Sequence, residues 1–179
     1  IEHFKIQNRG KIIHPCGSGK THTVIQIAKR INANNIIVVV PARALLLQHI
    51  YSFREEFKSK TFYAFGSLND WNKQLRKLRV TIFDPSVKNQ IKKINTIDKD
   101  VIIFTTLDSF TEISDYFKEG FFDLAIFDEA HRIAGGKNKE SINALHCKSY
   151  KKALFVTATE KTYIGDSICL LYTSDAADE

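Results

Sequence analysis

Short apolar runs recur along the chain at the lengths expected of buried strands. In Phe121–Phe127 the run is nearly continuous, which is typical of a strand covered on both faces in a parallel sheet. Similar segments elsewhere complete the set of predicted strands: Lys11–His14, Ile36–Val40, Thr61–Phe65, Val101–Thr105, Leu124–Phe127 and Ala153–Thr157.

Between these strands, apolar residues follow the spacing of one face of a helix. The stripes are Val24, Ile27, Ala28 and Ile31, then Leu46, Ile50, Phe53 and Phe57, then Phe110, Ile113 and Phe117. Ser109 and Glu112 have the spacing of a capping box that would open the last helix. The alternation predicts an α/β fold with a mainly parallel sheet and helices on both faces. Residues 66–100 show no clear pattern, and we expect a helical insertion there.

A glycine-rich turn joins the first predicted strand to the first predicted helix. It comprises Pro15, Cys16, Gly17, Ser18, Gly19, Lys20 and Thr21. Glycines let backbone N–H groups approach a ligand closely, and a helix N-terminus favours negative charge. In such a loop the lysine reaches the β- and γ-phosphates and the threonine hydroxyl ligates Mg²⁺. The turn therefore predicts a site for nucleotide phosphates; an ordinary turn with a surface lysine is the alternative.

A second polar group, Asp128, Glu129 and His131, follows the apolar run that ends at Phe127. Open α/β sheets bind ligands beyond the carboxyl ends of their strands. We expect Asp128 to hold Mg²⁺, directly or through water, and Glu129 to orient and deprotonate an attacking water. Favourable acidic residues at a helix N-terminus are the alternative explanation.

Together with the glycine-rich turn, Asp128-Glu-Ala-His131 resembles the first motor domain of superfamily 2 helicases and translocases. Val38–Gln48 resembles motif Ia of that superfamily, Phe104–Ser109 resembles motif Ib, and Phe155–Thr159 resembles motif III. Phe127–Gly135 is more similar to restriction-type helicases than to the RNA-dependent Asp-Glu-Ala-Asp group. The matches extend over about residues 11–160.

The resemblance implies a RecA-like P-loop domain of the DEAH-box type that uses ATP and Mg²⁺. It implies that Lys20, Asp128 and Glu129 are catalytic and that Thr21 and Asp128 contact the metal. Residues expected to couple the ATP state to the grip on nucleic acid are His131, Thr157 and Thr159. Residues expected to contact nucleic acid, with DNA favoured over RNA, are Pro41, Arg43, Thr105 and Thr106. A packed histidine at 131 and a surface arginine at 43 are the plainer explanations.

The hypothesis from these motifs is the ATP-binding lobe of a helicase or translocase that hydrolyses ATP with Mg²⁺ to drive movement on DNA. Two alternatives stay open. One is a restriction-system translocase on duplex DNA that does not separate strands. The other, for an isolated lobe, is a non-catalytic module that binds nucleotide and nucleic acid.

The chain also departs from the superfamily pattern. His14 stands where the phosphate loop usually has its first glycine, and Glu160 replaces the proline that usually follows motif III. Motifs IV to VI, the last of which supplies an arginine finger, are not found. We therefore expect a second RecA-like domain to be missing from this chain.

The two ends of the sequence indicate where the native domain is expected to begin and end. The sequence begins at Ile1 and contains no methionine, so we expect its natural start to be missing. Residues 169–179 lack Lys and Arg and resemble the translation of an adapter used in sequencing libraries. We expect one truncated domain, residues 1–168, followed by a segment that is not native.

Composition favours a soluble domain with a polyanionic partner. The 179 residues are 44% hydrophobic and 26% charged, and no apolar run approaches the length of a membrane span. We expect a cytoplasmic location, and the three cysteines have neither disulfide-framework nor zinc spacing. The net charge of +6 favours nucleic acid. Lys and Arg concentrate in residues 73–99, and Trp71 nearby could stack on a base. A solvated helical face with one core tryptophan is the plainer explanation.

Overall fold

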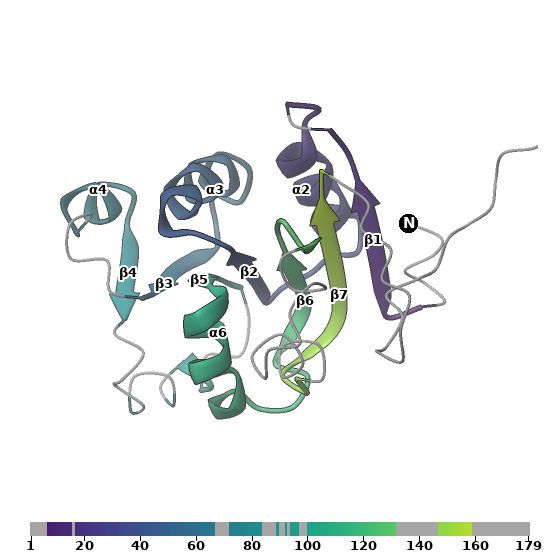
Figure 1. The fold of residues 1–179 in the computed structure, drawn as a ribbon. Helices are drawn as coiled ribbons and strands as arrows, with labels where there is room; N and C mark the ends of the chain where they lie inside the picture. The colour runs from purple at the N-terminus through teal and green to yellow at the C-terminus, as the bar shows by residue number, and fades with distance from the viewer. Residues whose placement is uncertain are drawn as a thin grey trace, which may run out of the picture.

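The computed structural model describes residues 7–15, 17–66, 72–83, 89, 92, 94–96, 100–131 and 147–158. Cys16, Trp71, Thr159 and residues 169–179, all of which carried expectations from the sequence, lie outside these ranges. Within the described ranges, seven parallel strands form one sheet, with helices on both of its faces (Figure 1). The predicted fold class is therefore confirmed.

The strands lie in the spatial order β1-β7-β6-β2-β5-β3-β4. Their bounds are β1 Arg9–Ile13, β2 Ile36–Val40, β3 Thr61–Phe65, β4 Val80–Phe83, β5 Val101–Thr106, β6 Phe122–Phe127 and β7 Tyr150–Thr157. The helices are α2 Lys20–Arg30, α3 Arg43–Glu56, α4 Asn72–Lys77 and α6 Leu107–Ile113, followed by the 3₁₀ turn η2 Ser114–Tyr116. None of the helices in the described ranges is long and apolar enough to cross a bilayer.

Each central strand supplies apolar side chains to two separate cores. In β2, Ile36, Val38 and Val40 pack into the core under α2, α3 and α4, whereas Ile37 and Val39 pack into the core under α6. Figure 1 shows the first three helices on one face of the sheet and α6 on the other. Every residue of β2 is buried, which explains why its continuous apolar run predicted both its ends correctly.

The segment 66–100 contains an element that the sequence analysis missed. Part of it is helical, as expected, because α4 forms with Leu75 buried against the core. However, β4 adds a strand to the sheet beside β3, so the expectation that the insertion is helical was only partly right. This strand has four residues and an exposed Thr81, and among the described strands it has one neighbour, β3. A short edge strand lacks the long apolar run that marked the central strands.

The start of α6 also differs from the prediction. The helix begins at Leu107, and the hydroxyl oxygen of Thr106 accepts the N–H of Ser109 at 3.5 Å. Ser109 therefore lies inside the first turn and is not the N-cap of a box with Glu112. Thr106 takes this role because it ends β5 in an extended conformation, which aims its hydroxyl at the free N–H groups of the next turn.

Because all the strand pairs are parallel, the segments that carry the motifs leave the sheet at the same edge. This carboxyl edge carries the glycine-rich turn after β1, the start of α3 after β2 and the acidic residues after β6. The opposite, amino edge carries the loops that enter the strands.

Candidate nucleotide-binding and catalytic site

The segment after β1 is a tight turn that leaves its backbone exposed. Both the N–H and the hydroxyl of Ser18 donate to the carbonyl oxygen of Pro15, at 3.3 and 2.7 Å. Gly17 and Gly19 have φ angles of 78° and 83°, a conformation that side chains disfavour. A Cβ built on either glycine would meet no atom within 4 Å. Among the described residues, the space beside the two glycines is thus open, as a loop that receives phosphate groups requires.

Helix α2 begins beside this open space with its N-terminal donors uncapped. Gly19 is the N-cap and has no side chain that could cap the helix, and no acidic residue lies in the first turn. The first-turn N–H groups and the positive end of the helix dipole favour an anion from outside the helix. Thr21, in the same turn, is half-buried.

Lys20 meets the acidic residues that follow β6. Its Nζ lies 3.6 Å from Oε1 of Glu129, and the two side chains are 14% and 22% exposed. A pair this shielded from water is screened less by salt than a surface pair. The structure thereby brings together the two motifs that the sequence carries more than a hundred residues apart.

Glu129 has an unusual backbone and several polar neighbours. Its φ angle of 50° lies in the left-handed region, which non-glycine residues rarely occupy. Its second carboxylate oxygen lies 3.1 Å from Nδ1 of His131, and the same nitrogen lies 3.1 Å from the hydroxyl of Thr157 in β7. Strained backbone of this kind is common at active sites. His131 therefore joins the acidic residue to the strand of motif III.

Asp128 is held by donors on both of its oxygens. Oδ2 lies 2.8 Å from Nε2 of His49 on α3, and Oδ1 accepts the N–H of Glu129 at 3.0 Å. Burial would raise the pKa of Asp128, but the hydrogen bond and charge of His49, that N–H and the nearby Lys20 together lower it below its usual value. The carboxylate is therefore ionised at neutral pH, as a metal ligand must be.

His49 is the site residue that the sequence analysis missed. It lies on the buried stripe of α3, beside Leu46, Ile50 and Phe53, at a position where the helical pattern predicts an apolar residue. A histidine within such a stripe was the available signal. Its partner could not be identified, because Asp128 is 79 residues away in the chain.

The residues expected to contact nucleic acid differ in their access to solvent. Arg43 is exposed at the first position of α3, and Pro41, two residues earlier, is half-buried. Thr106 is half-buried and caps α6. Thr105 is 0% exposed, and its hydroxyl donates to the carbonyl oxygen of Thr106 at 3.2 Å. In this conformation Arg43 is available for a direct contact and Thr105 is not.

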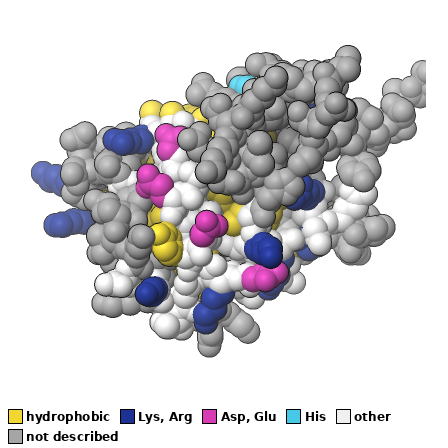
Figure 2. All heavy atoms as spheres, turned by 60° about the horizontal axis from the view of Figure 1, so that its bottom comes forward, with side chains coloured by type: hydrophobic (Ala, Val, Ile, Leu, Met, Phe, Trp, Pro, Cys, Tyr) yellow, Lys and Arg dark blue, Asp and Glu magenta, His cyan; other side chains and the backbone are white. Residues whose placement is uncertain are grey.

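The basic segment around α4 is exposed at the far side of the sheet from β1. Lys73, Arg76, Lys77 and Arg79 are all exposed, and residues 72–83 contain no Asp or Glu. Figure 2 shows Lys and Arg side chains projecting at this edge of the molecule. The segment therefore forms a solvated basic edge that is separate from the glycine-rich loop.

The residues present fit a nucleotide with Mg²⁺. Mg²⁺ takes oxygen ligands and is usually bound by one or two carboxylates together with substrate phosphates and water. Asp128 supplies an ionised carboxylate and Thr21 a hydroxyl beside the open loop. No group of three or more His, Cys, Asp or Glu in the described part of the chain has the arrangement of a metal site. A metal here would therefore depend on the phosphates for its remaining ligands.

Comparison with known proteins identifies the family. Residues 1–162 match the family described as type III restriction enzyme, res subunit. The chain belongs to this family. No curated protein matches the sequence. This membership confirms the predicted resemblance to superfamily 2 helicases of the restriction type.

Two solved structures share the fold. One is a nuclease-deletion mutant of the Type ISP restriction-modification enzyme LlaGI in complex with a DNA substrate mimic; it has a TM-score of 0.72 and 23% sequence identity. The other is the Pyrococcus furiosus Hef helicase domain, with a TM-score of 0.58 and 21% identity. The matches cover 88% and 87% of this chain but 14% and 31% of those chains. The likeness confirms the RecA-like fold of this res-subunit family member.

Proposed function

We propose that this domain binds ATP with Mg²⁺ and that the protein containing it hydrolyses ATP to move along DNA. The backbone of residues 17–19 and the N-terminus of α2 would bind the phosphates, with Lys20 neutralising their charge. Mg²⁺, when bound, supplies further charge neutralisation at the phosphates. The residues that would hold it are Thr21 and Asp128.

Glu129 is the proposed general base of the hydrolysis. Its carboxylate would orient a water and accept its proton, a role that requires an ionised acid close to the phosphates. Its contact with Lys20, 3.6 Å from Nζ to Oε1, supports this role, because Lys20 directly follows Gly19 of the glycine-rich turn. His131, between Glu129 and Thr157, is proposed to transmit the nucleotide state to β7. Thr159 is proposed to share that role.

One observation carries the proposal: Lys20, Asp128 and Glu129 converge beside an open glycine-rich loop. Lys20 opens α2 and the two acids follow β6, and the Lys20–Glu129 pair joins them. A turn with a surface lysine would not need a half-buried carboxylate partner.

The test is ATP hydrolysis by the full-length protein, with and without single-stranded and duplex DNA. We expect stimulation by DNA, and we expect Lys20→Ala to abolish hydrolysis because the phosphates lose the lysine ammonium that would neutralise their charge. Hydrolysis at the wild-type rate by Lys20→Ala would contradict the assignment. Stimulation by RNA but not DNA would change the proposed partner.

A second candidate is a translocase that tracks duplex DNA without separating its strands. The family description as a restriction-enzyme subunit favours it. A strand-displacement assay beside a triplex-displacement assay distinguishes the two. A translocase without unwinding activity displaces only the third strand, whereas a helicase also separates the duplex.

A further inference from the structure

His49 is a polar residue in an apolar environment. It is 8% exposed and lies on the face of α3 that packs against the sheet, between Leu46 and Ile50, which are both 0% exposed. Burying a polar side chain costs free energy unless hydrogen bonds replace those it made with water. An apolar residue would fill this position with a smaller desolvation cost, so the presence of a histidine needs an explanation.

The polar contact that the structure gives the His49 ring is with Asp128. Nε2 lies 2.8 Å from Oδ2, and an ionised carboxylate only accepts, so Nε2 carries the proton that is shared. The other ring nitrogen, Nδ1, is buried and has no hydrogen-bond partner among the described residues. The ring is therefore not held by a wider polar network on α3.

The contact fixes the direction of the Asp128 carboxylate. Oδ1 is already bonded to the N–H of Glu129, so the donor from His49 on Oδ2 determines the rotation of the group. Each oxygen retains a second lone pair. Carboxylates that bind metals commonly have such a hydrogen-bonded partner behind them, and its loss costs about 10–100-fold in metal affinity.

We propose that His49 is a positioning residue that holds the Asp128 carboxylate in the orientation required to bind Mg²⁺ with the nucleotide. This inference rests on the proposed function, since it assigns a role in the same site. It also gives α3 a part in the site that the sequence motifs alone do not show. The competing explanation is a core histidine whose bond to Asp128 serves only folding.

The experiment measures how binding of a fluorescent, non-hydrolysable ATP analogue to the 179-residue chain depends on Mg²⁺. His49→Leu fills the space without a donor, and His49→Gln restores an amide N–H near the position of Nε2. Ile50→Val, one residue along on the same face, is the matched control for a loss of packing. Thermal unfolding of each variant accompanies the binding measurements.

We expect His49→Leu to raise the Mg²⁺ concentration for half-maximal binding about 10-fold or more. Binding of the analogue in EDTA should stay near the wild-type value. In His49→Gln, the Mg²⁺ concentration for half-maximal binding should return close to the wild-type value. In Ile50→Val it should equal the wild-type value, although the melting temperature is lower. A purely structural role predicts equal Mg²⁺ dependence in His49→Leu and Ile50→Val, and that result would overturn the proposal.

A second pair keeps the test decisive if His49→Leu does not fold. His49→Asn places its amide near the position of Nδ1, too short to reach Asp128, whereas His49→Gln reaches it. The proposal is supported if His49→Asn needs a higher Mg²⁺ concentration for half-maximal binding than His49→Gln does. Equal Mg²⁺ concentrations for the two variants overturn it. If the wild-type chain itself shows no Mg²⁺-dependent binding, the proposed function fails together with the inference.

Discussion

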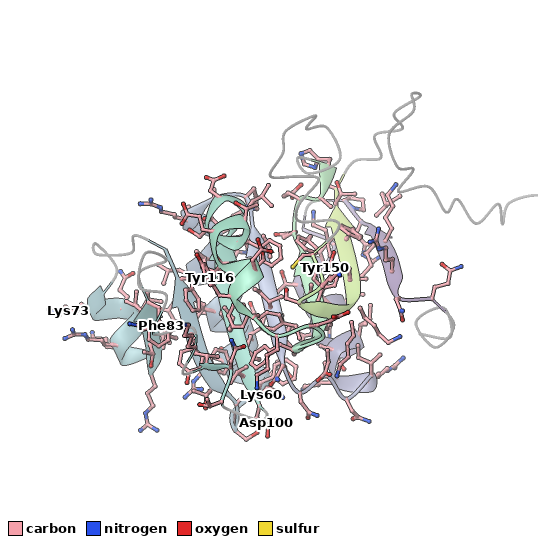
Figure 3. All side chains as sticks on the ribbon, turned by 90° about the horizontal axis from the view of Figure 1, so that it is seen from below. Lys60, Lys73, Phe83, Asp100, Tyr116 and Tyr150 are labelled. Atoms are coloured by element: carbon pink, nitrogen blue, oxygen red, sulfur yellow. The ribbon has the colours of Figure 1, made fainter. Side chains whose placement is uncertain are left out.

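The two edges of the sheet use polar residues in opposite ways. At the amino edge, Asp123 accepts the N–H groups of Asn34 and Asn35 at 2.9 and 3.2 Å and the ammonium of Lys151 at 2.8 Å. Figure 3 shows Lys60 and Asp100 together at this edge, where they pair at 2.9 Å. The bonds tie together the loops that enter neighbouring strands.

At the carboxyl edge, by contrast, polar groups lie beside glycines at which an added Cβ would meet none of the described residues. The glycine loop is open, the first turn of α2 has no side-chain cap, and Glu129 keeps a strained backbone. Polar groups whose hydrogen bonds are all made within the protein stabilise the fold. Oriented groups that can still make hydrogen bonds are suited to binding a ligand. The comparison therefore supports a stabilising role for the amino edge and the proposed chemistry at the carboxyl edge.

The largest expected effect is on hydrolysis, from Glu129→Gln in the full-length protein. The amide cannot accept the proton of water, so we expect the rate constant of ATP hydrolysis to fall about 10²–10⁴-fold. Binding of ATP and the melting temperature should change little. Turnover at the wild-type rate would show that Glu129 is not the base.

The corresponding change at the amino edge is Asp123→Ala. It leaves the N–H groups of Asn34 and Asn35 without their acceptor, so we expect a loss of about 1–3 kcal/mol in the free energy of unfolding. Urea denaturation measures this loss, with the exposed Glu119→Ala as the control. Affinity for nucleotide should be unchanged in the folded variant. A tenfold loss of nucleotide affinity would show that the amino edge also affects nucleotide binding, and would contradict the comparison.

The contribution of Asp123 should depend on pH. Burial raises the pKa of this carboxyl, but the bond from Lys151 and the N–H groups of Asn35 and Asn34 lower it more, so its pKa lies below the ordinary value. Such a group contributes stability above its unfolded pKa of about 3.9, and the contribution is lost as pH falls through the lower folded pKa. The stability difference between wild type and Asp123→Asn should be constant from about pH 7 to about pH 5 and shrink below about pH 4. A difference that grows on acidification would have the wrong sign.

The smallest expected effect is that of Asp100→Asn. Asp100 pairs with Lys60, but its side chain is 59% exposed, and exposed pairs contribute about 0–1 kcal/mol. Lys60 also keeps its bond to the carbonyl oxygen of Asn34 at 2.8 Å. Added salt should reduce the small difference further. A loss as large as that of Asp123→Ala would show that this exposed pair also ties the loops.

The carboxyl edge could be predicted from the sequence far better than the amino edge. Continuous apolar runs marked β2 and β3 to the residue, and local motifs marked Lys20, Asp128 and Glu129. The contacts of Asp123 and of His49 join residues 88 and 79 positions apart, respectively, and leave no local pattern. The strand β4 was missed because its four residues are too few, and too exposed, to form a long apolar run.

The most direct test of this account is amide hydrogen exchange of the 179-residue chain with and without an Mg²⁺-bound, non-hydrolysable ATP analogue. We predict new protection in residues 17–25 and 128–131, at the carboxyl edge. Exchange in residues 34–35 and 121–123, at the amino edge, should not change. Protection confined to the amino edge, or absent from both edges under conditions where the analogue binds, would contradict the account.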